Sequence, residues 1–450
     1  MSAKKRILNI LFWSVVSAAF IGPGTITTAA KSGAEFGMEL LWALVFSTLA
    51  CLLLQEAAAR LTIISGTNLG QAITKQFEKS KSKVLVLLLV LGAIVLGAAA
   101  YEMGNILGAV AGFLLIFNVP SYILILTIGG ISAIILNIPS LKIISTIMGF
   151  VVVIMGIGFL ITAFLIQPSF VEIALGAFIP RFPSTSQSGV LVLGLIGTTI
   201  VPYNLFLGSV ISNNKQTVKE MRFGLVIAIV LGGLFSMAVL IVGTSLAGQF
   251  SFEELAFALN KKIGFAGKYL LGFGLFAAGF TSAVTAPLAS AITLKSLFGN
   301  KNPEKWNPGS IRFKLGWGGI LIAGIGFALG NVKPIPAIIL AQALNGFLLP
   351  FVSIFLFIVI NNRRIVGTKN SNPTTLNILM ILVIFVTLVL GLNSASKAFY
   401  SVFFPEISTI NSLLFFISGI SFFISVLVWI KGMKSLPASP KWRSRKKSKK

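Results

Sequence analysis

Twelve apolar stretches, each long enough to cross a lipid bilayer, dominate this chain of 450 residues. A helix needs about 20 apolar residues to span roughly 30 Å of hydrocarbon. Only helices and closed barrels can cross that layer, because every backbone polar group in it must be bonded internally. We therefore predict an all-α integral membrane protein. The stretches are residues 8–31, 39–63, 84–116, 121–138, 141–166, 189–212, 222–247, 268–296, 315–331, 335–361, 374–393 and 411–431.

The positive charges are distributed unevenly between the two sides of the membrane. The sequence holds 36 Lys and Arg against 11 acids, a formal net charge of +25. If the amino terminus lies inside, 28 of these cations fall in inner segments and seven in outer segments, and Arg60 lies at an inner helix end. Cytoplasmic loops carry such an excess of Lys and Arg. We predict a multi-pass protein of the plasma or inner membrane with both termini in the cytoplasm.

Several residue types on which enzyme active sites depend are missing from the sequence. All eleven acids are glutamate, there is no histidine, and Cys51 is the one cysteine. These absences exclude a Ser-His-Asp triad, a histidine zinc site and an aspartyl phosphate. We therefore expect no enzyme and no cofactor. Membrane transport is favoured, and a channel or a sensor without transport are the alternatives.

The segment 432–450 is strongly basic and could bind nucleic acid or an anionic lipid surface. Because the rest of the chain contains no soluble nucleic-acid module, we interpret it as a cytoplasmic tail that helps to set the topology. The expected partners are the lipid bilayer and a transported ion, and nucleic acid is not one of them.

Two of the twelve spans are interrupted near their centres. Residues 21–28 read Ile-Gly-Pro-Gly-Thr-Ile-Thr-Thr, and residues 197–204 read Gly-Thr-Thr-Ile-Val-Pro-Tyr-Asn. Gly and Pro break a helix, and non-helical backbone at this depth is tolerated only where it is buried in protein or lines a cavity. Paired interruptions in corresponding helices of two halves indicate a transporter binding site. Spans 1–5 and 6–10 would then form a 5+5 inverted repeat with broken helices 1 and 6.

The same residues resemble the NRAMP family of metal transporters. Gly22-Pro23-Gly24-Thr25 resembles the family's first-helix motif, and Val201-Pro202-Tyr203-Asn204 its sixth-helix Met-Pro-His-Asn motif. The resemblance covers about residues 6–365 and implies a LeuT-like fold of the APC superfamily. It implies a transporter core over residues 1–365, two further helices over 366–431, and the tail over 432–450.

The departures from the family pattern fall on the metal ligands. The family's first-helix motif is Asp-Pro-Gly-Asn, whose Asp and Asn hold the metal. A divalent ion needs several such ligands, usually with negative charge among them. We therefore interpret the chain as a divergent member that lacks the metal-binding motif, and we expect no metal site. The positions that lose a ligand are Gly22, Thr25, Val201, Tyr203, Gly208 and Leu348.

Without a carboxylate, the interrupted helices suit an anion. Each half-helix begins with free N–H groups and a positive dipole end, and small oxyanions bind at such ends. We predict a small anion as substrate, with bicarbonate favoured and nitrate, formate or a small carboxylate as alternatives; a divalent cation such as Mn²⁺ or Mg²⁺ is the rival substrate. The expected substrate-binding residues are Gly22, Gly24, Thr25, Thr198, Thr199, Val201, Tyr203 and Asn204.

The coupling ion has two sets of candidate residues. Glu102 is the one carboxylate deep within a span, and by the resemblance it and Asn105 fall on the family's third-helix proton route. Acids inside a membrane are functional candidates by default. Thr281 and Ser282 could instead add hydroxyl ligands for Na⁺. Glu56 stands four residues before Arg60, which predicts an ion pair at a helix end.

Overall fold

A computed structural model describes the chain except for residues 1–8, 10–12, 14–20, 139–141, 184, 213–215, 247–249, 300–301, 331, 368–371, 404–410 and 435–450. The described part is helical and contains no strand, as predicted. Its elements are α2 (Pro23–Phe36), α3 (Leu41–Ser65), α4 (Leu69–Phe77), α5 (Lys83–Leu114), α6 (Ser121–Leu136), α7 (Lys142–Ile166), α8 (Phe170–Phe178), α9 (Ser186–Thr199), α10 (Pro202–Ile211), α11 (Val218–Gly243), α12 (Phe252–Ile263), α13 (Ala266–Phe298), η1 (Pro303–Trp306), α14 (Ile311–Leu329), α15 (Pro334–Ile360), α16 (Arg363–Val366), α17 (Thr374–Phe403) and α18 (Asn411–Lys434).

The predicted spans correspond to helices along most of the chain. Nine helices of the described part are long and apolar enough to cross a membrane, with α9 and α10 counted as one span. The pair α7 and α8 adds a tenth span, bent by 119° after Ile166. The shorter apolar helix α6 occupies the fourth predicted span. The first half of span 1 lies outside the described residues apart from Asn9 and Trp13.

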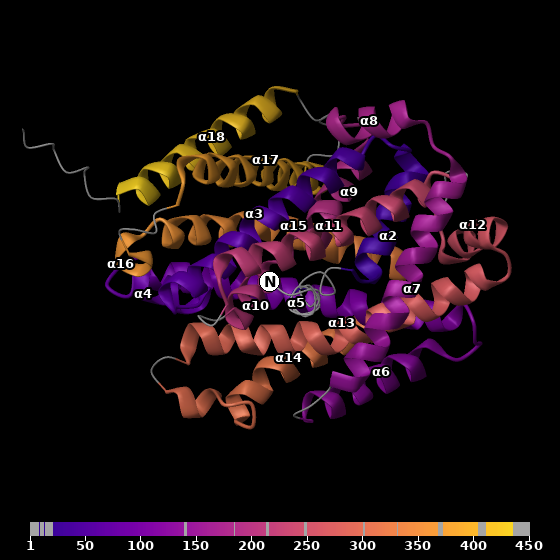
Figure 1. The fold of residues 1–450 in the computed structure, drawn as a ribbon, viewed down its shortest axis with the longest axis horizontal. Coiled ribbons are helices and arrows are strands. Elements are labelled where there is room, and N and C mark those ends of the chain that lie inside the picture. The colour runs from indigo at the N-terminus through magenta and orange to yellow at the C-terminus, as the bar shows by residue number, and fades with distance from the viewer. Residues whose placement is uncertain are drawn as a thin grey trace, which may run out of the picture.

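The broken segments lie in the centre of the bundle, surrounded by longer helices (Figure 1). Helices α2, α5, α9 and α15 pack against one another there, whereas α17 and α18 lie along one side of the bundle. Helix α9 approaches α15 closely because glycines face each other. A Cβ on Gly197 would lie 2.0 Å from the carbonyl oxygen of Gln342, and one on Gly346 would lie 2.3 Å from that of Leu193. Small residues allow membrane helices such close contact.

Short helices mark the two ends of the bundle. In Figure 1 the spans run across the view, with α4 and α16 at the left end and α8 and α12 at the right. The loops at the left end are those to which the charge bias assigns the cytoplasm. At this end Glu56 Oε1 accepts hydrogen bonds from Arg60 Nε at 2.9 Å and from the Arg222 guanidinium at 2.7 Å. The predicted pair with Arg60 is confirmed, and Arg222 joins it from α11.

Candidate functional site

The chain leaves the helical conformation between α9 and α10, as predicted for span 6. Ile200 has φ −115° and ψ 83°, and Val201 has φ −83° and ψ 126°. Pro202 is the first residue of α10, a position where its missing N–H costs no helical hydrogen bond. The break therefore lies where Pro starts a new helix, and residues 200–208 around it are buried.

Helix α2 begins in the same way, at Pro23. Gly22 precedes it in an extended conformation with φ −135° and ψ −176°, and its carbonyl oxygen accepts from the N–H of Thr25 at 3.1 Å. No side chain caps the N-terminus of either α2 or α10. Two buried helix N-termini therefore lack a side-chain cap, and the N–H groups of Thr25 and Asn204 are bonded instead to the backbone carbonyl oxygens of Gly22 and Val201.

The two breaks meet through a pair of threonines. The hydroxyls of Thr25 on α2 and Thr198 on α9 lie 2.8 Å apart and share a hydrogen bond, and both side chains are fully buried. Thr198 is one residue from the end of α9, and Thr25 is in the first turn of α2. We call this place, where the start of α2 meets the gap between α9 and α10, the junction.

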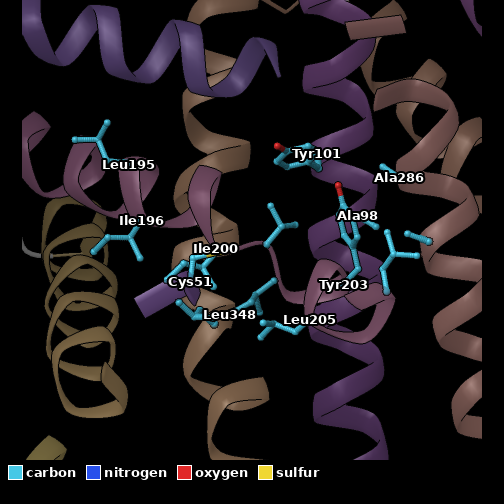
Figure 2. Packing of buried hydrophobic residues seen from close by; sticks show 14 of the residues in the cluster. Cys51, Ala98, Tyr101, Leu195, Ile196, Ile200, Tyr203, Leu205, Ala286 and Leu348 are labelled. Atoms are coloured by element: carbon cyan, nitrogen blue, oxygen red, sulfur yellow. The ribbon is translucent and has the colours of Figure 1, made fainter. Parts of the chain in front are cut away.

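Two tyrosines pack beside the junction (Figure 2). The rings of Tyr101 on α5 and Tyr203 on α10 meet edge to face, with centroids 5.9 Å apart. The Tyr101 hydroxyl also forms a hydrogen bond with Thr198. Asn204 follows Tyr203 in the first turn of α10 and is buried. Hydroxyl groups from three helices therefore converge on this place.

Gly22 faces a small polar environment on α13 and α5. A Cβ built on Gly22 would lie 3.4 Å from Ser282 Oγ, 3.9 Å from the Tyr101 hydroxyl and 4.0 Å from Asn105 Oδ1. These are ordinary contact distances, so a Cβ fits at position 22. The buried Ser282 Oγ has no hydrogen-bond partner in the described part of the chain. Of the predicted coupling residues, Ser282 and Asn105 are the ones that lie beside Gly22.

Gln342 on α15 lies against Gly24 and was not among the predicted site residues. A Cβ on Gly24 would lie 2.1 Å from Gln342 Nε2, so only glycine fits at position 24 while that amide stays in place. Gln342 is 1% exposed, and its Oε1 has no partner in the described part. A polar residue within an apolar span was the available sequence signal, because such residues usually face the interior of the bundle.

The hydroxyls of two predicted site residues, Thr199 and Thr281, form hydrogen bonds away from the junction. Thr199 donates to the carbonyl oxygen of Leu195 at 3.0 Å and accepts from Ser47 of α3 at 3.1 Å. Thr281 donates to the carbonyl oxygens of Ala277 and Ala278 in its own helix, at 2.7 and 3.1 Å. The structure therefore does not bring either hydroxyl into the junction. Serine and threonine in membrane helices commonly bond back to their own helix in this way.

Glu102 is fully buried between α5 and α14. Its Oε2 accepts from Asn105 Nδ2 at 3.5 Å, a long contact within the same helix, and its Oε1 has no partner in the described part. The side chain packs onto Gly324, where an added Cβ would lie 2.4 Å from Glu102 Cγ. Acids buried in membrane helices are functional candidates by default, which makes Glu102 a candidate proton carrier.

The described residues contain no group of three or more His, Cys, Asp or Glu side chains that could hold a metal ion. At the junction Gly22 and Val201 offer no side-chain ligand, and Thr25 and Tyr203 offer neutral hydroxyls. Backbone carbonyl oxygens and amides complete the available groups. The arrangement therefore provides hydrogen-bond donors and the positive ends of two helices, with no carboxylate, imidazole or thioether among the junction residues.

The sequence is similar to proteins of one known family. The sequence profile of the natural resistance-associated macrophage protein-like (Nramp) family matches residues 14–397. The chain is 27% identical over 372 residues to the divalent metal cation transporter MntH of Bacillus subtilis, covering 79% of this chain and 84% of that protein. It is 26% identical over 402 residues to the natural resistance-associated macrophage protein 2 homolog of Dictyostelium discoideum, covering 85% of this chain and 62% of that protein.

Solved structures share the fold. The Eremococcus coleocola manganese transporter matches 96% of this chain and 94% of its own with a TM-score of 0.72 at 21% identity. Mhp1, a nucleobase-cation-symport-1 family transporter, matches 96% of this chain and 94% of its own with a TM-score of 0.54 at 15% identity. The all-helical LeuT-like fold predicted from the sequence is thereby confirmed.

Proposed function

Because the chain belongs to the Nramp family, whose curated relatives here are membrane transporters and not enzymes, we propose that it is a secondary transporter whose substrate is a small anion, with bicarbonate favoured. The fold, the helix breaks and the family support a transporter. The chemistry of the junction supports a small anion as the substrate, with nitrate, formate or a small carboxylate as alternatives to bicarbonate.

One observation carries the anion proposal: two buried, uncapped helix N-termini meet at the junction. Each helix begins with a proline, which has no N–H, so within the described residues one first-turn N–H group, that of Gly24 in α2 and that of Tyr203 in α10, has no backbone partner beside the positive dipole end. Oxyanions bind at such ends without Lys or Arg. The Thr25 and Thr198 hydroxyls, now bonded to each other, can turn to donate to an anion between them. Bicarbonate is small and planar, and a few N–H and O–H donors satisfy it.

The names of the curated relatives favour a second candidate, a divalent cation such as Mn²⁺ or Mg²⁺. Such an ion needs several oxygen, nitrogen or sulfur ligands, usually with negative charge among them. Gly22 and Val201 supply none, and Thr25 supplies a neutral hydroxyl. The buried carboxylate of Glu102 contacts Asn105 and packs onto Gly324. The positive ends of two helices also repel a cation, so we place the anion first.

Anion uptake against an inside-negative membrane potential requires a coupled cation. Glu102 supports coupling to H⁺, because its buried carboxyl can bind and release a proton. Ser282 and Asn105 support coupling to Na⁺, because their oxygens lie 3.4 and 4.0 Å from the Cβ position of Gly22. We propose that one of these two ions drives the transport.

The test is uptake of labelled bicarbonate by purified protein in proteoliposomes, under an inward Na⁺ gradient, under a pH gradient, and under neither. Protein-free vesicles correct for CO₂ that crosses the lipid. Saturable uptake driven by either gradient supports the proposal. Bicarbonate uptake no faster than in protein-free vesicles under all three conditions, from folded protein, refutes it.

A further inference from the structure

A cavity of about 730 Å³ lies at the end of the bundle that the charge bias assigns to the cytoplasm. It lies between the start of α4, the end of α6, the end of α10, the last turns of α13, and the segment leading into α14. Most of its wall is apolar. Val210, Leu288, Ile292 and Phe313, from α10, α13 and α14, are among its apolar lining residues.

The polar groups of this cavity are suited to an anion. Lys295 and Lys314 line it together with the amides of Asn68, Gln71 and Asn137, and no acid is among its lining residues. Within the described residues neither lysine forms an ion pair. Lys295 is half-buried and Lys314 is exposed. Two unpaired cations beside a concave apolar wall raise the local concentration of anions and lower that of cations.

A continuous face of α13 connects this cavity with the level of the junction. Thr281, Thr285, Leu288, Ile292 and Lys295 follow one another at intervals of four, three, four and three residues, so they lie on one side of the helix. All five are partly exposed, whereas most residues between them are buried. The last three line the cavity. The face runs about 21 Å along the helix axis.

Helix α10 reaches the same cavity through Val210, while Tyr203 and Leu207 on the same side of the helix are buried. Tyr203, Leu207 and Val210 are spaced by four and three residues and therefore share one side of α10. Tyr203 belongs to the junction, and Val210 lines the cavity. The two helices that contribute Tyr203 and Ser282 to the junction region therefore both reach the cavity two or three turns further on.

We propose that this cavity and the partly exposed face of α13 form the cytoplasmic half of the anion's route. Lys295 and Lys314 are the positive charges at its cytoplasmic opening. The inference rests on the proposed function for the identity of the substrate, and it adds the route and its charge selection. The lysines attract an anion to the cytoplasmic opening and repel a divalent cation there. The partly exposed side of α13 guides the anion from this opening toward the two helix ends.

The first experiment tests the route without any assumption about the transported ion. In a Cys51→Ser background, Leu288→Cys is treated with an anionic and with a cationic methanethiosulfonate. Ala289→Cys, buried on another side of α13, is the matched control. We expect Leu288→Cys to react and Ala289→Cys not to. For Leu288→Cys, the ratio of the labelling rate by the anionic reagent to that by the cationic reagent should fall roughly threefold to tenfold when Lys295 and Lys314 are both replaced by glutamine.

An unreactive Leu288→Cys would overturn the route, and a rate ratio unaffected by the lysines would overturn their role. The second experiment measures the apparent KM for bicarbonate at each membrane face. Lys295→Gln/Lys314→Gln should raise the cytoplasmic KM roughly threefold or more and leave the opposite KM unchanged.

The control Lys79→Gln/Lys81→Gln removes two exposed charges at the same end, outside the cavity, and should change neither KM. Equal effects of the two double variants would overturn the role of the lysines. Failure of the proposed function is distinguishable from these outcomes: the wild type would then carry no bicarbonate, while the cysteine labelling would still report the charge selection.

Discussion

Placing a carboxylate at Gly22 should abolish anion transport without unfolding the protein. The structure has room for this change, because a Cβ at Gly22 meets Ser282 Oγ at 3.4 Å and has no closer neighbour. The backbone there is extended, a conformation that any residue adopts. Gly22 also occupies the N-cap of α2, where aspartate and asparagine are among the preferred residues. The fold should therefore tolerate both Gly22→Asp and Gly22→Asn.

The expected loss follows from the distance between two negative charges. An aspartate at the N-cap would lie roughly 4 Å from an anion bound at the same helix end, and at an effective dielectric constant of about 20 the repulsion is about 4 kcal/mol. This energy corresponds to a roughly thousandfold weaker affinity. Aspartate and asparagine can both accept an N–H group at the N-cap, and asparagine has the shape of aspartate without its charge, so the pair of variants isolates the electrostatic effect.

The assay is labelled bicarbonate uptake in proteoliposomes of the wild type, Gly22→Asp and Gly22→Asn, with melting temperature and monodispersity measured in detergent. We expect no measurable uptake by the aspartate variant, substantial uptake by the asparagine variant, and folding stabilities within about 1 kcal/mol of the wild type. If Gly22→Asp takes up bicarbonate at the rate of the wild type, the placement of the anion at this helix end is refuted. Equal loss in both variants would show that the effect comes from the side chain's bulk or its capping of the helix and not from its charge.

Three further changes test other parts of the structure. Thr25→Ala removes the hydroxyl bonded to Thr198 and should raise the KM for bicarbonate roughly tenfold to hundredfold, whereas Thr25→Ser should stay near the wild type in the same uptake assay. Glu102→Gln keeps the shape of the side chain and should slow transport or flatten its dependence on pH between about 6 and 8. The yield of monodisperse protein should not change. An unaltered pH profile of transport would assign Glu102 a structural role. Gly324→Ala forces a methyl group to 2.4 Å from Glu102 Cγ and should cost about 1–3 kcal/mol in thermal unfolding, whereas Gly326→Ala, with nothing within 4 Å, should not destabilise.

The fold was predictable because membrane helices leave a strong local signal. Apolar stretches longer than about 20 residues locate the spans. Pro202 located the start of α10, and Pro23 the start of α2, because proline favours the first turn of a helix and disrupts its interior. The sequence ended the fifth span at residue 166, where α7 ends, but it did not predict α8 or its 119° angle to α7, because that angle depends on the backbone between them, where Gln167 has a φ of 54°.

The site was predictable only in part, because the direction of a side chain depends on its neighbours in space. The sequence placed Thr198 and Thr199 together at a break, but adjacent residues on a helix point about 100° apart. Thr198 faces Thr25, and Thr199 faces Ser47. Gln342 lies more than 300 residues from Gly24, and only the close packing of α15 on α2 brings its amide to the junction.

The central claim is that the junction selects an anion where the named relatives carry divalent metals. Its most direct test is uptake of labelled bicarbonate and of Mn²⁺, measured side by side in one preparation of wild-type proteoliposomes with protein-free vesicles as the reference. Our proposal predicts saturable bicarbonate uptake and Mn²⁺ uptake no faster than in the protein-free vesicles, because Gly22, Thr25 and Val201 offer a cation neither charge nor a soft ligand. Saturable Mn²⁺ uptake without bicarbonate uptake would contradict the account.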